Sequence, residues 1–256
     1  MHFNDQTIDA RALDAATIRA LLMLSLGAWF VSGPHPRVAE TFAFALDWLA
    51  ETAPKTAFLF KRLRTRLNAD ENAEALSEAE RDFARVFCVG KELFPSSESA
   101  FRTGLLMQEP RDEMRRWMVA NGLDHAPDER TPEDHLGMEL TFGYRLLKHV
   151  LAADEAYEAR ISTDVGREDA VSDEIREAEE RFEAYVRERL AWPIEAEPLI
   201  EALPEGVTKD LLWLTLFVVE ARWPSPCGTR RPGGGIRHAV FGAPRSEVSL
   251  HVRSSC

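Results

Sequence analysis

Apolar residues recur at intervals of three or four positions through most of the first 220 residues. One such series, in residues 12–31, consists of Ile18, Leu22, Leu26 and Trp29. These intervals place side chains on one face of an α-helix, which can then pack against a core. No alternating run bounded by hairpin turns occurs before residue 220, so strands are not expected there. The pattern predicts an all-α fold, a single helical bundle of roughly nine to eleven helices.

Local capping signals give the expected helix starts. Ser77, with Glu80 three residues later, forms a capping box, and Ser172 directly precedes a strongly charged segment. We therefore predict that helices begin at these two serines. Thr131 and Pro132 predict a further start, because a hydroxyl can accept an orphan backbone N–H and a proline at the first helical position needs no donor.

Two further segments are characterised by their composition. Residues 56–67 predict a helix that carries Lys61, Arg62, Arg64 and Arg66, which we interpret as a solvated face. Residues 211–219 are apolar on all sides, which favours a buried helix over a strand.

The chain divides at residue 221 by charge and by helix-breaking residues. Residues 222–256 contain six arginines, one acid and several Pro and Gly residues. Their net charge is +5, whereas residues 1–221 carry −17, which gives the whole chain its net charge of −12. We expect residues 1–221 to form one helical domain and residues 222–256 to be a disordered or loosely packed tail. Within the domain, residues 123–131 contain Pro127 and several acids, which predicts a hinge between an N-terminal half ending near 122 and a C-terminal half over 132–221.

The charge and the cysteines exclude several classes of protein. A net charge of −12 argues against nucleic-acid binding, which needs clustered Lys and Arg to neutralise phosphates. Three cysteines without a CxxC pair fit a reducing compartment. The longest apolar run, residues 21–31, is about half the length that a membrane span requires. We expect a soluble, cytoplasmic protein without stable membrane insertion.

The segment from Thr131 to Leu140 carries the chemistry that capping does not explain. Asp134 can be interpreted as a carboxylate in the first helical turn, but His135 would then lie at the positive end of the helix dipole, where protonation of imidazole is disfavoured. Glu129, Pro132, Asp134 and His135 resemble the E-x-P-x-D-H signature of the TorD/DmsD/NarJ family of redox-enzyme maturation chaperones. Residues 95–99 and 104–113 resemble that family's middle segment. Two residues separate Glu129 from Pro132, where family members have none or one.

The resemblance implies a chaperone and not an enzyme. Such proteins bind the twin-arginine leader of a cofactor-containing oxidoreductase subunit, commonly a molybdenum enzyme, and delay its export until the cofactor is loaded. Its implied peptide-binding residues are Asp134, His135, Pro132, Glu129 and Glu139. The alternative is an assembly chaperone that binds the cofactor-free catalytic subunit independently of its leader. The protein would be a monomer or a homodimer that exchanges helical halves, and it would need no cofactor of its own.

Two other interpretations of this region are weaker. The pairs Asp124-His125 and Asp134-His135 could supply metal ligands, but their spacing matches no standard metal site. The methionines near the signature suggest either an adaptable peptide groove or ordinary core packing, and both remain open: Met107, Met114, Met118 and Met138. The sequence contains no nucleophile elbow, P-loop or dinucleotide fingerprint.

Overall fold

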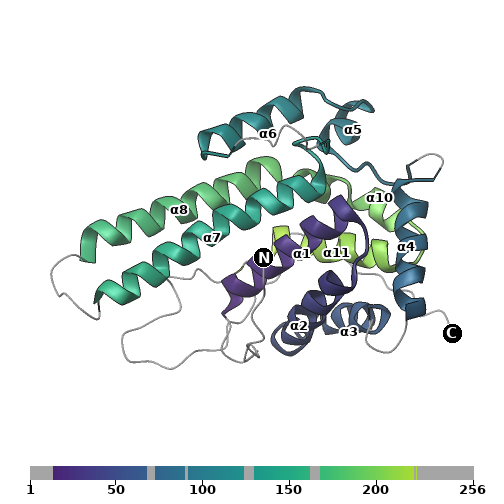
Figure 1. The fold of residues 1–256 in the computed structure, drawn as a ribbon, viewed down its shortest axis with the longest axis horizontal. Coiled ribbons are helices and arrows are strands. Elements are labelled where there is room, and N and C mark those ends of the chain that lie inside the picture. The colour runs from purple at the N-terminus through teal and green to yellow at the C-terminus, as the bar shows by residue number, and fades with distance from the viewer. Residues whose placement is uncertain are drawn as a thin grey trace.

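The computed structural model describes residues 14–67, 73–89, 92–123, 130–161, 168–221 and 223. Within these ranges the chain forms eleven helices, and its only β structure is one isolated bridge. The helices are α1 (Ala15–Ser32), α2 (Pro36–Thr52), α3 (Ala57–Arg66), α4 (Ala73–Phe87), α5 (Glu98–Thr103), α6 (Glu109–Ala120), α7 (Leu136–Ile161), α8 (Glu168–Arg189), α9 (Trp192–Glu195), α10 (Glu197–Ala202) and α11 (Val207–Glu220) (Figure 1). The predicted all-α fold is confirmed.

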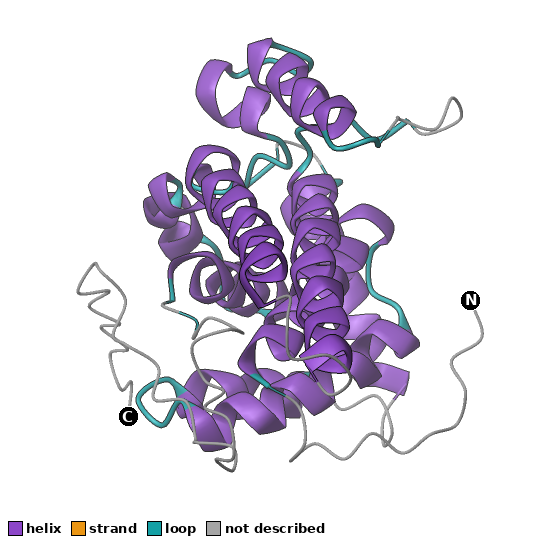
Figure 2. Cartoon of the chain, turned by 90° about the vertical axis from the view of Figure 1, so that its left-hand side faces the viewer, coloured by secondary structure: helices purple, strands orange, loops and turns teal. Residues whose placement is uncertain are grey.

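The two longest helices, α7 and α8, lie side by side and form the long axis of the molecule (Figure 1). Helix α1 packs along α7, and α11 contacts α1, α3 and α4. The short pair α5 and α6 forms a separate layer across the top, as the turned view also shows (Figure 2). The α5–α6 layer contributes several residues to the candidate site.

Helix α1 is the centre of the core. The carboxylate of Asp14 accepts a 2.7 Å hydrogen bond from the amide of Thr17, and Gly33 ends the helix with a φ of 78°. The four residues of its predicted apolar stripe have no exposed surface. Among the described helices α1 has the length and composition of a membrane span, but most of it is buried in the protein, as expected for a core helix.

Helices α1 and α7 approach closely because two glycines meet where they pack. A Cβ on Gly27 would lie 2.9 Å from the carbonyl oxygen of Gly137, and a Cβ on Gly137 would lie 2.7 Å from that of Gly27. Real side chains do not come so close to a backbone. Small residues at both positions therefore set the spacing between these helices.

Two predicted helix starts are wrong. Helix α4 begins at Ala73, so Ser77 lies inside it, where its hydroxyl accepts a hydrogen bond from Arg81. Helix α8 begins at Glu168, which places Ser172 inside it as well. The residues between Ala73 and Ser77 are good helix formers, so α4 extends through the local capping signal. Residues 211–219 form a helix, within α11.

The basic face of α3 is not simply solvated. Asp210 of α11 has no exposed surface and forms ion pairs with Arg62 and Arg66, the second at 2.7 Å. A buried carboxylate needs such partners, because its charge is costly to remove from water. Two of the four basic residues therefore hold α3 to α11.

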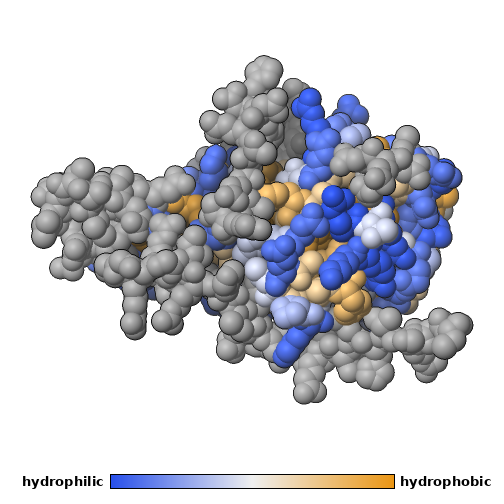
Figure 3. Space-filling view, turned by 90° about the horizontal axis from the view of Figure 1, so that it is seen from below, coloured by the Kyte–Doolittle hydropathy of each residue, from blue (hydrophilic) through white to orange (hydrophobic). Residues whose placement is uncertain are grey.

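Helices from both sides of residue 123 pack together, since α1 contacts α7 and α4 contacts α11. Residues 124–129 of the predicted hinge and nearly all of the tail lie outside the described residues. The domain boundaries, the hinge and the loose tail stay predictions. Seen from below, hydrophilic side chains alternate with smaller hydrophobic areas on the described surface (Figure 3).

Candidate functional site

The predicted helix start at Thr131 and Pro132 is wrong, and a turn takes its place. The amide of His135 donates a 3.0 Å hydrogen bond to the carbonyl of Pro132, and α7 begins only at Leu136. His135 caps this helix itself. Its carbonyl accepts from the amide of Glu139 at 2.9 Å, and its Nδ1 accepts from the amide of Gly137 at 3.2 Å.

A tertiary contact explains the later helix start. Ser97 and His135 form an antiparallel bridge, in which the amide of Leu136 donates to Ser96 at 2.9 Å and the amide of Glu98 donates to Asp134 at 3.0 Å. A bridge requires extended backbone at His135, which a helix starting at Pro132 would not allow. The bridge joins the two segments on which the family resemblance rests.

Asp134 stabilises a different helix from the one predicted. Its side chain has no exposed surface, and its Oδ2 accepts a 2.8 Å hydrogen bond from the amide of Ser99 in the first turn of α5. Its Oδ1 has no hydrogen-bond partner among the described residues. The carboxylate therefore fixes α5 to the turn that precedes α7.

Glu133, the preceding residue, holds α6 to the same turn. Its buried carboxylate forms a two-pronged ion pair with Arg111, with Nε–Oε2 and Nη2–Oε1 distances of 2.6 and 3.3 Å. The hydrogen bond from Arg111 to Glu133 raises the pKa of the guanidinium. Planar guanidinium–carboxylate pairs of this kind are strong and directional.

Arg189, near the end of α8, connects three other helices. It is almost completely buried; its guanidinium forms ion pairs with Glu98 of α5 and Glu113 of α6, and it donates to the carbonyl of Pro110 at 3.0 Å. One nitrogen also lies 3.8 Å from Oε1 of Glu139 in α7. A buried guanidinium with several acceptors fixes the α5–α6 layer over α7 and α8.

Glu139 is the most deeply placed acid of this cluster. Its side chain has no exposed surface, and its Oε2 accepts a 2.7 Å hydrogen bond from the indole Nε1 of Trp192. Burial raises its pKa well above the ordinary value, and the charge of Glu98 adds to the rise, while the Trp192 hydrogen bond and Arg189 oppose it. Burial likewise raises the pKa of Glu98.

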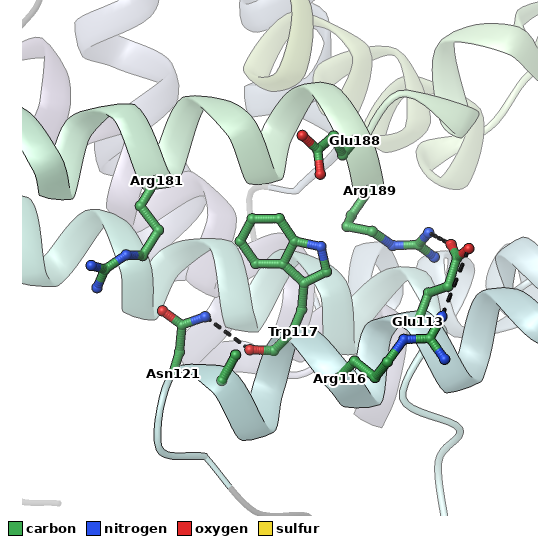
Figure 4. A pocket seen from close by; sticks show the side chains of 8 residues that line it. Glu113, Arg116, Trp117, Asn121, Arg181, Glu188 and Arg189 are labelled. Atoms are coloured by element: carbon green, nitrogen blue, oxygen red, sulfur yellow. Dashed lines mark hydrogen bonds and ion pairs between the residues drawn. The ribbon is translucent and has the colours of Figure 1, made fainter.

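A groove of about 680 Å³ opens between α6 and α8 beside this cluster. Trp117 lies in it (Figure 4). Its ring packs against Tyr185 of α8 at a centroid distance of 5.5 Å. The Glu113–Arg189 pair borders one end of the groove (Figure 4). Arg116, Arg181 and Glu188 also line it, so its rim carries both signs of charge.

The predicted peptide-binding residues divide by exposure. Pro132 and His135 are partly exposed, whereas Asp134 and Glu139 are buried and cannot touch a peptide from their present positions. Glu129, Asp124 and His125 lie outside the described residues. Among the described residues no group of His, Cys, Asp and Glu could hold a metal ion.

The sequence reasoning did not select Arg189, Arg111, Glu98 or Trp192. Arg189 follows Arg181 and Arg187 in a charged helix, and helical spacing alone does not distinguish the buried arginine from the exposed ones. The methionines also differ: Met114 and Met118 are buried in the core, while Met107 is 56% exposed.

The chain matches the model of a known protein family. The family model described as "Nitrate reductase delta subunit" matches residues 42–188, more than half of the chain, from within α2 nearly to the end of α8. The matched range contains residues 95–113 and the whole signature. A search of curated proteins and a search of solved structures found no match.

Proposed function

We propose, because the chain belongs to the nitrate reductase delta subunit family of molybdoenzyme maturation chaperones, that it binds the twin-arginine leader of a molybdenum oxidoreductase subunit in the cytoplasm. The leader would be held until the cofactor is in place. Family membership is the observation that carries this proposal, since these proteins are chaperones and not catalysts.

The charge and the surface of the protein suit such a ligand. A twin-arginine leader combines two guanidinium groups with an apolar segment, and this chain is strongly acidic before its tail. Exposed ion pairs contribute only about 0 to 1 kcal/mol each. Burial of some five apolar side chains contributes roughly 8 to 15 kcal/mol, less about 2 to 5 kcal/mol for ordering the peptide. We expect affinity to come from apolar contact and selection for arginine to come from carboxylates.

The five predicted residues receive different proposed roles. Pro132 and His135 are exposed enough to contact the leader. Asp134 and Glu139 would act indirectly, because they fix the turn and the helices that carry the contact surface. Glu129 keeps its proposed role as a leader contact.

His135 allows a sharp test of direct contact. His135→Asn keeps a side-chain acceptor for the amide of Gly137, because asparagine is a good helix cap, but it removes the imidazole ring. We expect this variant to be as stable as the parent and to bind a twin-arginine leader several-fold more weakly. His135→Ala is the matched variant that loses the cap as well. Unchanged leader affinity in His135→Asn would remove His135 from the contact surface.

A pull-down tests the target of the chaperone. The tagged chain is expressed with a molybdenum oxidoreductase subunit that carries a twin-arginine leader, either complete or without the leader. We expect retention of the complete subunit and loss of the leaderless one. Equal retention of both would favour the alternative function, an assembly chaperone that grips the cofactor-free subunit itself.

A further inference from the structure

Three consecutive apolar side chains are exposed in the loop between α5 and α6. Leu105, Leu106 and Met107 are 62%, 53% and 56% exposed. Single exposed apolar residues are common on protein surfaces, but three in a row in a short loop form a contiguous patch. We call residues 105–107 the apolar loop.

The backbone of the apolar loop is held in a disfavoured conformation. Met107 has a φ of 57° and is the only non-glycine residue with positive φ in the described part of the chain. A left-handed backbone is rare for a residue with a side chain, and it persists only where its surroundings impose it. Gly104 before the loop is also left-handed, with a φ of 74°, but glycine adopts this conformation without strain.

Hydrogen bonds fix the apolar loop at both ends. The hydroxyl of Thr103 accepts from the amide of Leu105 at 3.2 Å, and the side-chain amide of Gln108 donates to the carbonyl of Leu106 at 2.8 Å. These polar contacts hold the backbone of Leu105 and Leu106, while the apolar side chains of the loop are exposed.

Two further hydrogen bonds connect the residue after the apolar loop to the buried signature carboxylate. The amide of Gln108 donates to the hydroxyl of Ser99 at 3.0 Å, and the amide of Ser99 donates to Oδ2 of Asp134 at 2.8 Å. Ser99 and Asp134 both have no exposed surface. Two hydrogen bonds thus connect Asp134 to Gln108, the residue directly after the apolar loop.

We infer that the apolar loop is the docking surface for the apolar segment of the client's leader, and that Asp134 is a positioning residue which acts on it through Ser99. The inference rests on the proposed function and assigns the binding of the leader's apolar segment to residues 105–107. On this inference a buried signature residue would affect a peptide that it does not touch.

Size and charge favour a leader over a second copy of the chain. Three side chains supply a small part of the about 800 Å² per partner that a stable dimer buries. The first turn of α6, directly after the loop, carries the exposed acids Glu109 and Asp112. An apolar patch beside carboxylates matches a peptide in which an arginine pair lies next to an apolar segment.

Titration with two peptides tests this inference. The probes are a synthetic leader with an arginine pair followed by an apolar segment of about 12 residues, and the same peptide with three leucines of that segment replaced by serine. The loop variant is Leu105→Ser, Leu106→Ser and Met107→Ser together. The matched control is Phe58→Ser with Val89→Ser, which removes exposed apolar side chains from outside the loop.

We expect the loop variant to bind the apolar leader about 10- to 100-fold more weakly than the parent does. Both proteins should bind the serine peptide with equal, weak affinity, because the partner of the loop has been removed. The control variant should bind both peptides as the parent does. Ser99→Ala, which removes the acceptor for Gln108, should weaken binding of the apolar leader and leave binding of the serine peptide unchanged, a selectivity that the accompanying loss of stability would not produce.

The possible outcomes separate the inference from the proposed function. Equal binding of the apolar leader by the loop variant and the parent would overturn the inference and leave leader binding intact. An equal loss for both peptides would also overturn it, because the loop would then not contact the apolar segment. If the parent itself binds neither peptide, the proposed leader binding fails.

Discussion

The indole Nε1 of Trp192 donates a 2.7 Å hydrogen bond to Oε2 of Glu139, a carboxylate with no exposed surface. Trp192 follows α8 and Glu139 lies in the first turn of α7. One buried acid thus links the helix that follows the signature to the segment that follows Arg189. The neighbouring charges of Glu98 and Arg189 act on it with opposite signs.

Glu139→Gln is expected to raise stability at neutral pH. Burial raises the pKa of Glu139 well above 4.5, so the folded protein holds a proton that the unfolded chain has lost. The free energy of unfolding therefore falls as the pH rises above about 4.5, until the pKa of the folded state is reached. The amide can still accept from Trp192 but does not titrate. Urea unfolding should show a more stable variant at pH 7 and a difference that vanishes near pH 4.5; a difference independent of pH would contradict this account.

Arg189→Ala is expected to lower the free energy of unfolding by about 3 to 5 kcal/mol, because it removes the buried guanidinium that pairs with Glu98 and Glu113 and leaves Glu98 with Arg102 as its remaining cation. Arg187→Ala is the matched control, since Arg187 is 70% exposed in the same helix. Its effect should stay within about 0.5 kcal/mol. Urea unfolding of the two arginine variants at pH 7 measures the difference. Equal effects of the two arginine substitutions would contradict the structural role of Arg189.

Gly137→Ala is expected to cost about 1 to 3 kcal/mol, because the added methyl group would meet the backbone of α1. Gly143→Ala provides the comparison. A Cβ there would lie 2.8 Å from the end of the Met23 side chain, which can move, and not against backbone. Thermal unfolding of both variants measures the difference. A loss no greater at Gly137 than at Gly143 would show that α1 and α7 separate without strain.

The long helices could be predicted from the sequence because each repeats its apolar spacing over several turns. Helices α5, α9 and α10 have four to six residues, too few to show a period, and they were not predicted. The start of α7 was misplaced because the bridge between Ser97 and His135 is a tertiary contact that local capping signals do not contain.

The candidate site was only partly accessible from the sequence. The resemblance selected two segments, and the structure brings them together through Asp134 and Ser99. The two acids that hydrogen-bond Arg189, Glu113 and Glu98, lie 76 and 91 residues away in the chain, so no local pattern could reveal them. In the sequence, the exposed charged residues of α8 show the same helical spacing as the buried Arg189.

The most direct test of leader binding is calorimetric titration of the purified full chain with two synthetic peptides. One has an arginine pair followed by an apolar segment of about 12 residues, and the other has both arginines replaced by glutamine. The account predicts stoichiometric binding of the arginine peptide and at least about tenfold weaker binding of the glutamine peptide. Equal affinities for the two peptides, or no binding of either, would contradict it.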